Sequence, residues 1–153
     1  EELPLGLFAP LALRLLVEAE PRAMTRTTHS GFAPIHELFR EGDLERVGIC
    51  LELLPKQAIT TLTKGGNSAL HVACANPHCD PRLIKMLTEA VPELASKANR
   101  QGQPPLFIAL GLEQPSVGVV TALLAAAPAA VLAVDESYNT AFSLAAAKRD
   151  SDE

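Results

Sequence analysis

The sequence contains no tryptophan and only one tyrosine, and aromatic residues make up 4% of the chain. A large core built around aromatic side chains is therefore not expected. Alanine and leucine supply most of the 48% hydrophobic content instead. Small side chains let helices approach one another closely, so this composition suits thin stacked layers better than one large central core.

Cysteine, positive charge and long apolar runs are also scarce. Three cysteines cannot all pair, and nothing else indicates a secreted disulfide scaffold, so we expect a reducing intracellular compartment, cytoplasmic or nuclear. The formal net charge of −5 disfavours a nucleic-acid partner, because such binders are normally basic. No apolar run approaches the roughly 20 residues that a membrane span needs, so we expect no membrane association.

Proline recurs along the chain with a nearly constant period. Pro21, Pro55, Pro92 and Pro128 follow one another at intervals of 34, 37 and 36 residues. Apolar residues stand eight and five positions before each proline, which predicts one face of a helix that ends there. Self-similarity of this length predicts a stack of repeated units. The apolar pairs are Leu13 and Leu16, Val47 and Cys50, Ile84 and Leu87, and Val120 and Leu123.

A second segment recurs about fifteen residues beyond each proline, and it predicts the start of another helix. Glycine stands five residues before the segment's last member in three units, as Gly31, Gly66 and Gly102, whereas the fourth has Tyr138. Glycine there fits a tight turn with positive φ. The segments are Ala33-Pro34-Ile35-His36, Ser68-Ala69-Leu70-His71, Pro104-Pro105-Leu106-Phe107 and Thr140-Ala141-Phe142-Ser143.

These segments resemble the ankyrin repeat, whose signature is a turn followed by Thr-Pro-Leu-His-x-Ala and two antiparallel helices. The resemblance implies an all-α solenoid of helix pairs with hairpin-like finger loops between the units. It also implies that His36 and His71 are structural and tie one unit to the next. Gly42-Asp43, and Asp80 before Pro81, fit the start of each unit's second helix.

The whole chain reads as one array of such units. Residues 1–30 correspond to the end of one unit, and 31–65, 66–101 and 102–137 to three full units. Residues 138–153 correspond to the first helix of a fifth. Because no unit buries both helices alone, neighbouring units are expected to share one elongated core. We also expect the array to be a monomer in isolation.

Chemistry-bearing residues are few. His71, Cys74, His78 and Cys79 have metal-ligating side chains, but the repeat motif explains His71, and Cys74 lies on the small-residue side of the same helix. His78 and Cys79 are expected in a surface turn, so a metal- or redox-responsive module is the weaker interpretation. Cys50 occupies an apolar helix position and is expected to be inert. We expect no enzymatic activity and no cofactor.

Charge is distributed unevenly between the expected loops and helices. No aspartate or glutamate occurs from residues 24 to 32, 58 to 69 or 95 to 105, whereas acids gather on the helices and in the last loop, at Asp135 and Glu136. The loops could thus present a basic edge that steers a protein partner with an acidic surface. The candidate contact residues there are Arg26, His29, Lys64, Asn67, Lys97, Asn99, Arg100 and Gln103.

A stripe along the first helices offers a further candidate surface. It reads Glu37, Val72, Ile108 and Leu144, and becomes apolar toward the C-terminus. If exposed, Val72 and Ile108 would add hydrophobic contact to a concave binding face; otherwise they pack against the adjoining helix.

Together these patterns predict a non-catalytic module that binds a protein partner through finger loops and the concave helix face. The alternative is a structural spacer or regulatory flank beside a catalytic domain outside this sequence.

Overall fold

The computed structural model describes residues 5–29 and 31–147. Regular structure in that part of the chain is entirely helical, which confirms the expected all-α class. The α-helices are α1 (Leu5–Ala19), α2 (Pro34–Glu41), α3 (Leu44–Leu53), α4 (Lys56–Ile59), α5 (Ala69–Cys74), α6 (Pro81–Ala90), α7 (Pro105–Gly111), α8 (Val117–Ala126) and α9 (Ala141–Ala146). Three short 3-10 helices are η1 (Pro21–Thr25), η2 (Pro92–Ala95) and η3 (Pro128–Leu132).

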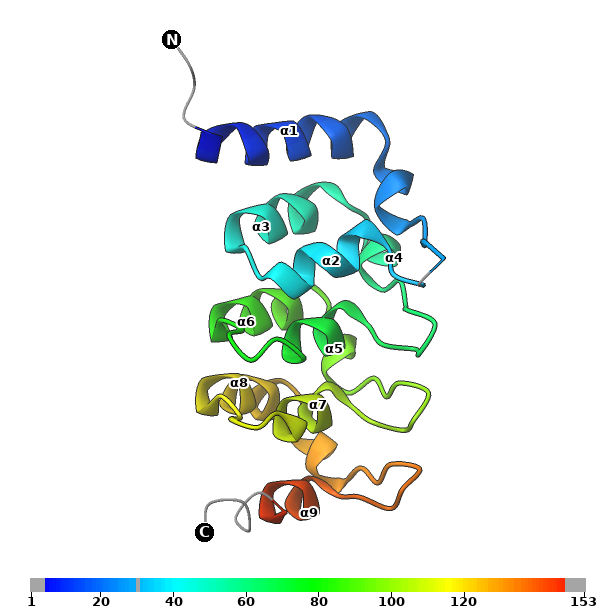
Figure 1. The fold of residues 1–153 in the computed structure, drawn as a ribbon, viewed down its shortest axis with the longest axis vertical. Coiled ribbons are helices and arrows are strands. Elements are labelled where there is room, and N and C mark those ends of the chain that lie inside the picture. The colour runs from blue at the N-terminus through cyan, green and yellow to red at the C-terminus, as the bar shows by residue number, and fades with distance from the viewer. Residues whose placement is uncertain (1–4, 30, 148–153) are drawn as a thin grey trace.

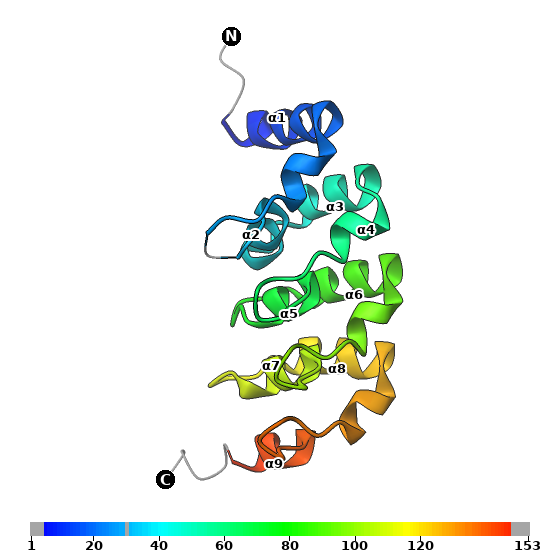
Figure 2. The ribbon, with the colours of Figure 1, turned by 90° about the vertical axis from the view of Figure 1, so that its right-hand side faces the viewer.

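The helices stack in two columns along the long axis of the molecule (Figure 1). In one column α1, α3, α6 and α8 contact one another in that order, and in the other α2, α5, α7 and α9 do so. Helices α2 and α3, α5 and α6, and α7 and α8 also contact each other, so each pair forms a layer. The loops that join successive layers project from one side of the stack, and Figure 2 shows the molecule from that side.

The four recurrent prolines mark helix ends, as the sequence predicts. Each stands two residues after the last residue of α1, α3, α6 or α8. The residue before each proline leaves the helical region, with φ of −149° at Glu20, −91° at Leu54, −140° at Val91 and −143° at Ala127. Proline disfavours helical backbone in the residue before it, which explains these ends. Each proline then opens a short helical segment, which the spacing alone did not predict.

Side-chain caps begin the longer helices of the layers. The carboxylate of Asp43 accepts the backbone N–H groups of Glu45 and Arg46, and that of Asp80 accepts the N–H of Arg82. These bonds satisfy donors that have no partner within the helix. The predicted cap at Asp80, with Pro81 in the first helical position, is confirmed.

One continuous hydrophobic core runs through the layers. Cys50, Leu87 and Leu123 are buried, as their shared position before a proline predicts. The same prediction is wrong for Leu16, which is 70% exposed, while the next residue, Val17, is buried. Helix α1 lies at the end of its column and packs on α3, so its buried face is set by that contact rather than by the repeat spacing.

A buried imidazole ties the second layer to the third. In α5, Nδ1 of His71 accepts the backbone N–H of Ser68 at 3.2 Å and lies 2.8 Å from the hydroxyl of the same serine. Its Nε2 lies 2.9 Å from the carbonyl oxygen of Gln103, in the loop that precedes α7 of the next layer. A carbonyl oxygen only accepts, so Nε2 carries the proton, and the ring is neutral with Nδ1 as an acceptor.

The first layer repeats this arrangement with His36 in α2. Its Nδ1 accepts the N–H of Ala33 at 3.0 Å, and its Nε2 lies 2.8 Å from the carbonyl oxygen of Thr61. In the third layer Phe107 occupies the equivalent position in α7 and is buried. A phenyl ring makes no such bond, so this junction lacks the imidazole tie.

Burial lowers the pKa of His71 below its ordinary value. The bond to the carbonyl of Gln103 opposes this shift, and the nearby charge of Lys97 adds to it. Because the folded state holds the imidazole neutral, the unfolded state binds more protons in acid. The contribution of His71 to stability is therefore complete above the unfolded pKa of about 6.5 and is lost as the pH falls below it.

We predict that replacing His71 by glutamine flattens the pH dependence of stability between pH 7.5 and 5.5. Glutamine can still accept the N–H of Ser68 but does not titrate. At pH 7.5 the variant should be about 1 kcal/mol less stable, because the bond to Gln103 is lost or weakened. Urea unfolding followed by circular dichroism at several pH values measures both effects.

The exposed His78 supplies the control, since H78Q should leave the slope unchanged. A variant H71Q with the slope of the unaltered protein would contradict the neutral, buried imidazole described above.

Candidate partner-binding surface

The loops between layers end in four turns of one geometry, at residues 28–31, 63–66, 99–102 and 135–138. In each turn the carbonyl of the first residue accepts the N–H of the fourth, and the N–H of the first donates to the carbonyl of the fifth. We call these four-residue segments the finger turns. The fourth position has positive φ throughout: 81° at Gly31, 76° at Gly66, 75° at Gly102 and 62° at Tyr138. The predicted glycine turns are confirmed, and Tyr138 adopts the same conformation despite its side chain.

Neighbouring finger turns contact one another directly. The N–H of Arg100 donates to the carbonyl of Gly65 at 3.1 Å, and the N–H of Glu136 donates to that of Gln101 at 3.0 Å. In the first pair the Lys64 ammonium donates to the carbonyl of His29 at 2.6 Å. The turns therefore form a connected row, and their second residues, His29, Lys64, Arg100 and Glu136, are its tips.

Glycine is required where a neighbouring turn packs over the row. A Cβ atom at Gly66 would lie 2.9 Å from the backbone nitrogen of Arg100 and 3.0 Å from its Cγ. At Gly31 it would lie 2.4 Å from Cγ of Lys64. Positive φ and close contact thus coincide at these positions, so both the turn and the stacking depend on the missing side chain.

Three amides that the sequence suggested as partner contacts instead hold the finger turns in place. The Asn99 side chain accepts the N–H groups of Gln101 and Gln103, and it donates to the side-chain oxygen of Asn67 at 2.9 Å. The Gln103 side chain donates to Asp135 at 3.0 Å. These contacts lie within and between turns, so Asn67, Asn99 and Gln103 have mainly an internal role.

Asp135 belongs to the same network and is nearly buried. Its carboxylate accepts hydrogen bonds from the Gln103 side chain, from Asn139, and from the N–H of Ser137. The bond from Gln103 is the main cause of a lowered pKa of Asp135, and burial opposes it. Asn99 and Asp135, 36 residues apart, both begin a turn with an Asx side chain, so Asp135 has a structural role in the row besides interrupting its basic edge.

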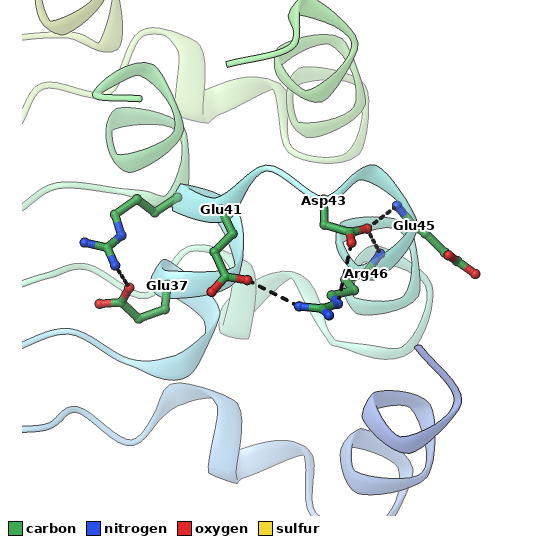
Figure 3. Close-up of polar contacts among 6 residues, drawn as sticks. Glu37, Glu41, Asp43, Glu45 and Arg46 are labelled. Carbon is green, nitrogen blue, oxygen red and sulfur yellow. Dashed lines mark hydrogen bonds and ion pairs between the residues drawn. The ribbon is translucent and has the colours of Figure 1, made fainter. Parts of the chain in front are cut away.

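Five cations on the helices each have a carboxylate within ion-pairing distance. Figure 3 shows Glu41 and Asp43 both directed at Arg46, with Glu37 on the neighbouring turn of α2. Such exposed pairs add little to stability, but they offset the positive charge locally. The pairs are Arg14 with Glu52, Arg40 with Glu37, Arg46 with Glu41, Arg82 with Asp80, and Lys85 with Glu89.

Cations of the layer connections are different. Across residues 5–29 and 31–147, no carboxylate lies within ion-pairing distance of their side chains. Arg26, His29, Lys64 and Arg100 are exposed, and Lys97 is half-buried. Uncompensated positive charge is therefore concentrated on the side of the stack from which the loops project. The connection cations are Arg22, Arg26, Lys56, Lys64, Lys97 and Arg100.

The apolar stripe of the first helices offers little surface. Val72 is 5% exposed, and Ile108 and Leu144 are half-buried against the core. Glu37 is half-buried and pairs with Arg40. Of the two possibilities that the sequence left open, packing against neighbouring helices is the one observed, and Val72 is removed from the contact candidates.

The three cysteines are all buried, and Cys79 is only 7% exposed, so its predicted place on the surface is wrong. Burial raises the pKa of Cys50 and of Cys79 to about 11 and also raises the pKa of Cys74, each keeping its thiol protonated at neutral pH. His78 is exposed on the turn beside them. Among the described residues, no three His, Cys, Asp or Glu side chains converge on a point where a metal ion could bind.

Comparison with known proteins adds no assignment. No protein-family model matches the chain, and no curated protein matches it significantly. None of the described helices combines the length and apolar character needed to cross a membrane.

We predict that replacing Gly66 by alanine destabilises the protein by about 2 kcal/mol or more. The new Cβ carries the strain of positive φ, and it meets backbone rather than a flexible side chain. The matched control is G48A in α3, where a Cβ would reach only Cε of Met86 at an ordinary 3.7 Å. That change should stabilise the protein by about 0.5–1 kcal/mol through helix propensity.

Thermal and urea unfolding of both variants compare the two sites. Equal effects of the two substitutions would show that the row of finger turns does not pack as described.

Proposed function

We propose that this chain is an array of ankyrin repeats that binds an acidic protein partner through its finger turns, without catalysis or cofactor. The repeat assignment is supported by stacked helix pairs, by glycines with positive φ in three of the four turns, and by the imidazole ties of His36 and His71. These features occur in phase with the sequence period that first suggested the family.

The observation that carries the partner proposal is the segregation of paired and unpaired cations. Within residues 5–29 and 31–147 of this protein of net charge −5, the cations without a carboxylate partner belong to the layer connections. Among them Lys64 and Arg100 are exposed tips, and Arg26 is exposed two residues before the first finger turn. Charges arranged in this way accelerate encounter with a partner of opposite sign and orient it. The helices of the two columns, whose described cations are paired, provide no comparable field.

The remaining sequence candidates are less favoured. Asn67, Asn99 and Gln103 are engaged within the row, and Ile108 is half-buried. A metal- or redox-responsive role is not proposed, because Cys74 and Cys79 are buried and protonated and Nδ1 and Nε2 of His71 are both engaged.

The test reverses the charge of three exposed cations that lie in or beside the finger turns. The variant R26E/K64E/R100E should capture the partner from a cell lysate at least about tenfold less efficiently, because three exposed charge pairs are lost and replaced by repulsion. Quantitative mass spectrometry of the captured proteins provides the measurement, and raising the salt concentration should weaken capture by the unaltered protein.

The control R40E/R82E/K85E changes the net charge by the same amount, on exposed helix cations that each have a carboxylate partner. It should retain capture. Unchanged capture by R26E/K64E/R100E, or equal loss in both variants, would show that the finger turns are not the binding surface.

A further inference from the structure

The four tips provide one exposed side chain from each finger turn. His29, Lys64, Arg100 and Glu136 each hold the second position of a finger turn, and all four are exposed. Direct hydrogen bonds between successive turns fix their relative positions. The row is thus a series of linked turns that repeat at one interval, rather than a set of independent loops.

The distance between successive tips follows from the geometry of the hydrogen-bonded finger loops. Each finger contributes two chain segments, and hydrogen-bonded segments lie about 4.8 Å apart, so successive tips are about 10 Å apart. Stacked helices, which lie about 8–10 Å apart, give the same interval. Whatever binds along the row must repeat its contacts at this distance.

The sign of the charge changes along the row. Lys64 and Arg100 are positive, and Glu136, one layer further, is negative. Across the described residues, none of these three side chains has an ion-pair partner. A complementary ligand therefore presents negative, negative and positive groups in that order, about 10 Å apart.

The backbone groups that join successive finger turns are not available to a ligand. The N–H groups of Arg100 and Glu136 and the carbonyls of Gly65 and Gln101 already bond one turn to the next. An added β-strand depends on free groups of this kind. A polyproline II segment needs none, because its own backbone is solvated and it has no internal hydrogen bonds.

Polyproline II also matches the interval. It has three residues per turn and rises about 3.1 Å per residue, so every third side chain faces the same way at about 9 Å. We infer that the tips at Lys64, Arg100 and Glu136 recognise a proline-rich segment of the partner in which two acidic residues and then a basic residue occupy every third position. This rests on the proposed function and names the chemistry of the partner at that surface.

The inference is tested with synthetic peptides added to ¹⁵N-labelled protein at low salt. The probe is a nine-residue proline peptide with glutamate at its second and fifth positions and lysine at its eighth, and a second probe has the reverse order. The control peptide has the same composition with its three charges adjacent. Amide shifts report binding, and we expect those at Lys64, Arg100 and Glu136 to move most.

One of the two spaced probes should bind about threefold to tenfold more tightly than the control peptide, as expected for two or three matched exposed charge pairs. Equal affinities would overturn the inference, because charge alone would then be read. Tighter binding of an alanine-rich helical peptide with charges seven residues apart would overturn it in favour of a helix.

A specificity exchange tests the sign change separately. The variant E136K should prefer a probe whose third charged residue is glutamate, whereas the unaltered protein prefers lysine there. The control E113K makes the same charge change at an exposed position in the loop between α7 and α8, and it should keep the original preference. An unchanged preference in E136K would contradict the ordered row.

Failure here is distinguishable from failure of the proposed function. If R26E/K64E/R100E loses capture of the partner but no spaced peptide is preferred, the fingers bind and the extended proline-rich segment is wrong. If capture also survives the triple reversal, both proposals fall.

Discussion

No layer of this protein buries both of its helices by itself, and the rest of the structure follows from that constraint. Stacking supplies the missing burial, and it requires the loops of successive layers to lie in register. The imidazoles of His36 and His71 hold that register by joining a helix start to the loop of the next layer. Missing side chains at Gly31 and Gly66 let neighbouring turns close on one another. The alignment of the tips is a by-product of packing.

Much of this arrangement could be predicted from the sequence, because its signals are local. Proline sets helix ends through its neighbour's backbone, and glycine marks positive φ, whatever surrounds them. The errors concern neighbours distant in sequence. Leu16 matches the repeat pattern, but the end of a column lacks the second layer that would bury it. Cys79 and the side chains of Asn67 and Asn99 are likewise positioned by contacts that spacing does not encode.

The same composition gives the protein a negative net charge and leaves some loop cations without a carboxylate partner. Acidic residues on the helices keep the net charge negative and neutralise nearby arginines, as Glu41 and Asp43 do for Arg46. Connections that contain few acids leave their cations uncompensated. A surface of this kind is not evident from net charge, because it depends on which cations have a carboxylate within ion-pairing distance.

Because Phe107 replaces the buried histidine in α7, the junctions between successive layers are not equally strong. In a linear array, unfolding free energy is shared between intrinsic terms and couplings of nearest neighbours, so the junction with the fewest ties opens first. The junction beyond α7 retains the Gln103–Asp135 and Gln101–Glu136 bonds but has no imidazole bond to the following loop. Separation of α9 and its finger turn from the remaining layers therefore breaks no imidazole bond, unlike opening of the two junctions that His36 and His71 join.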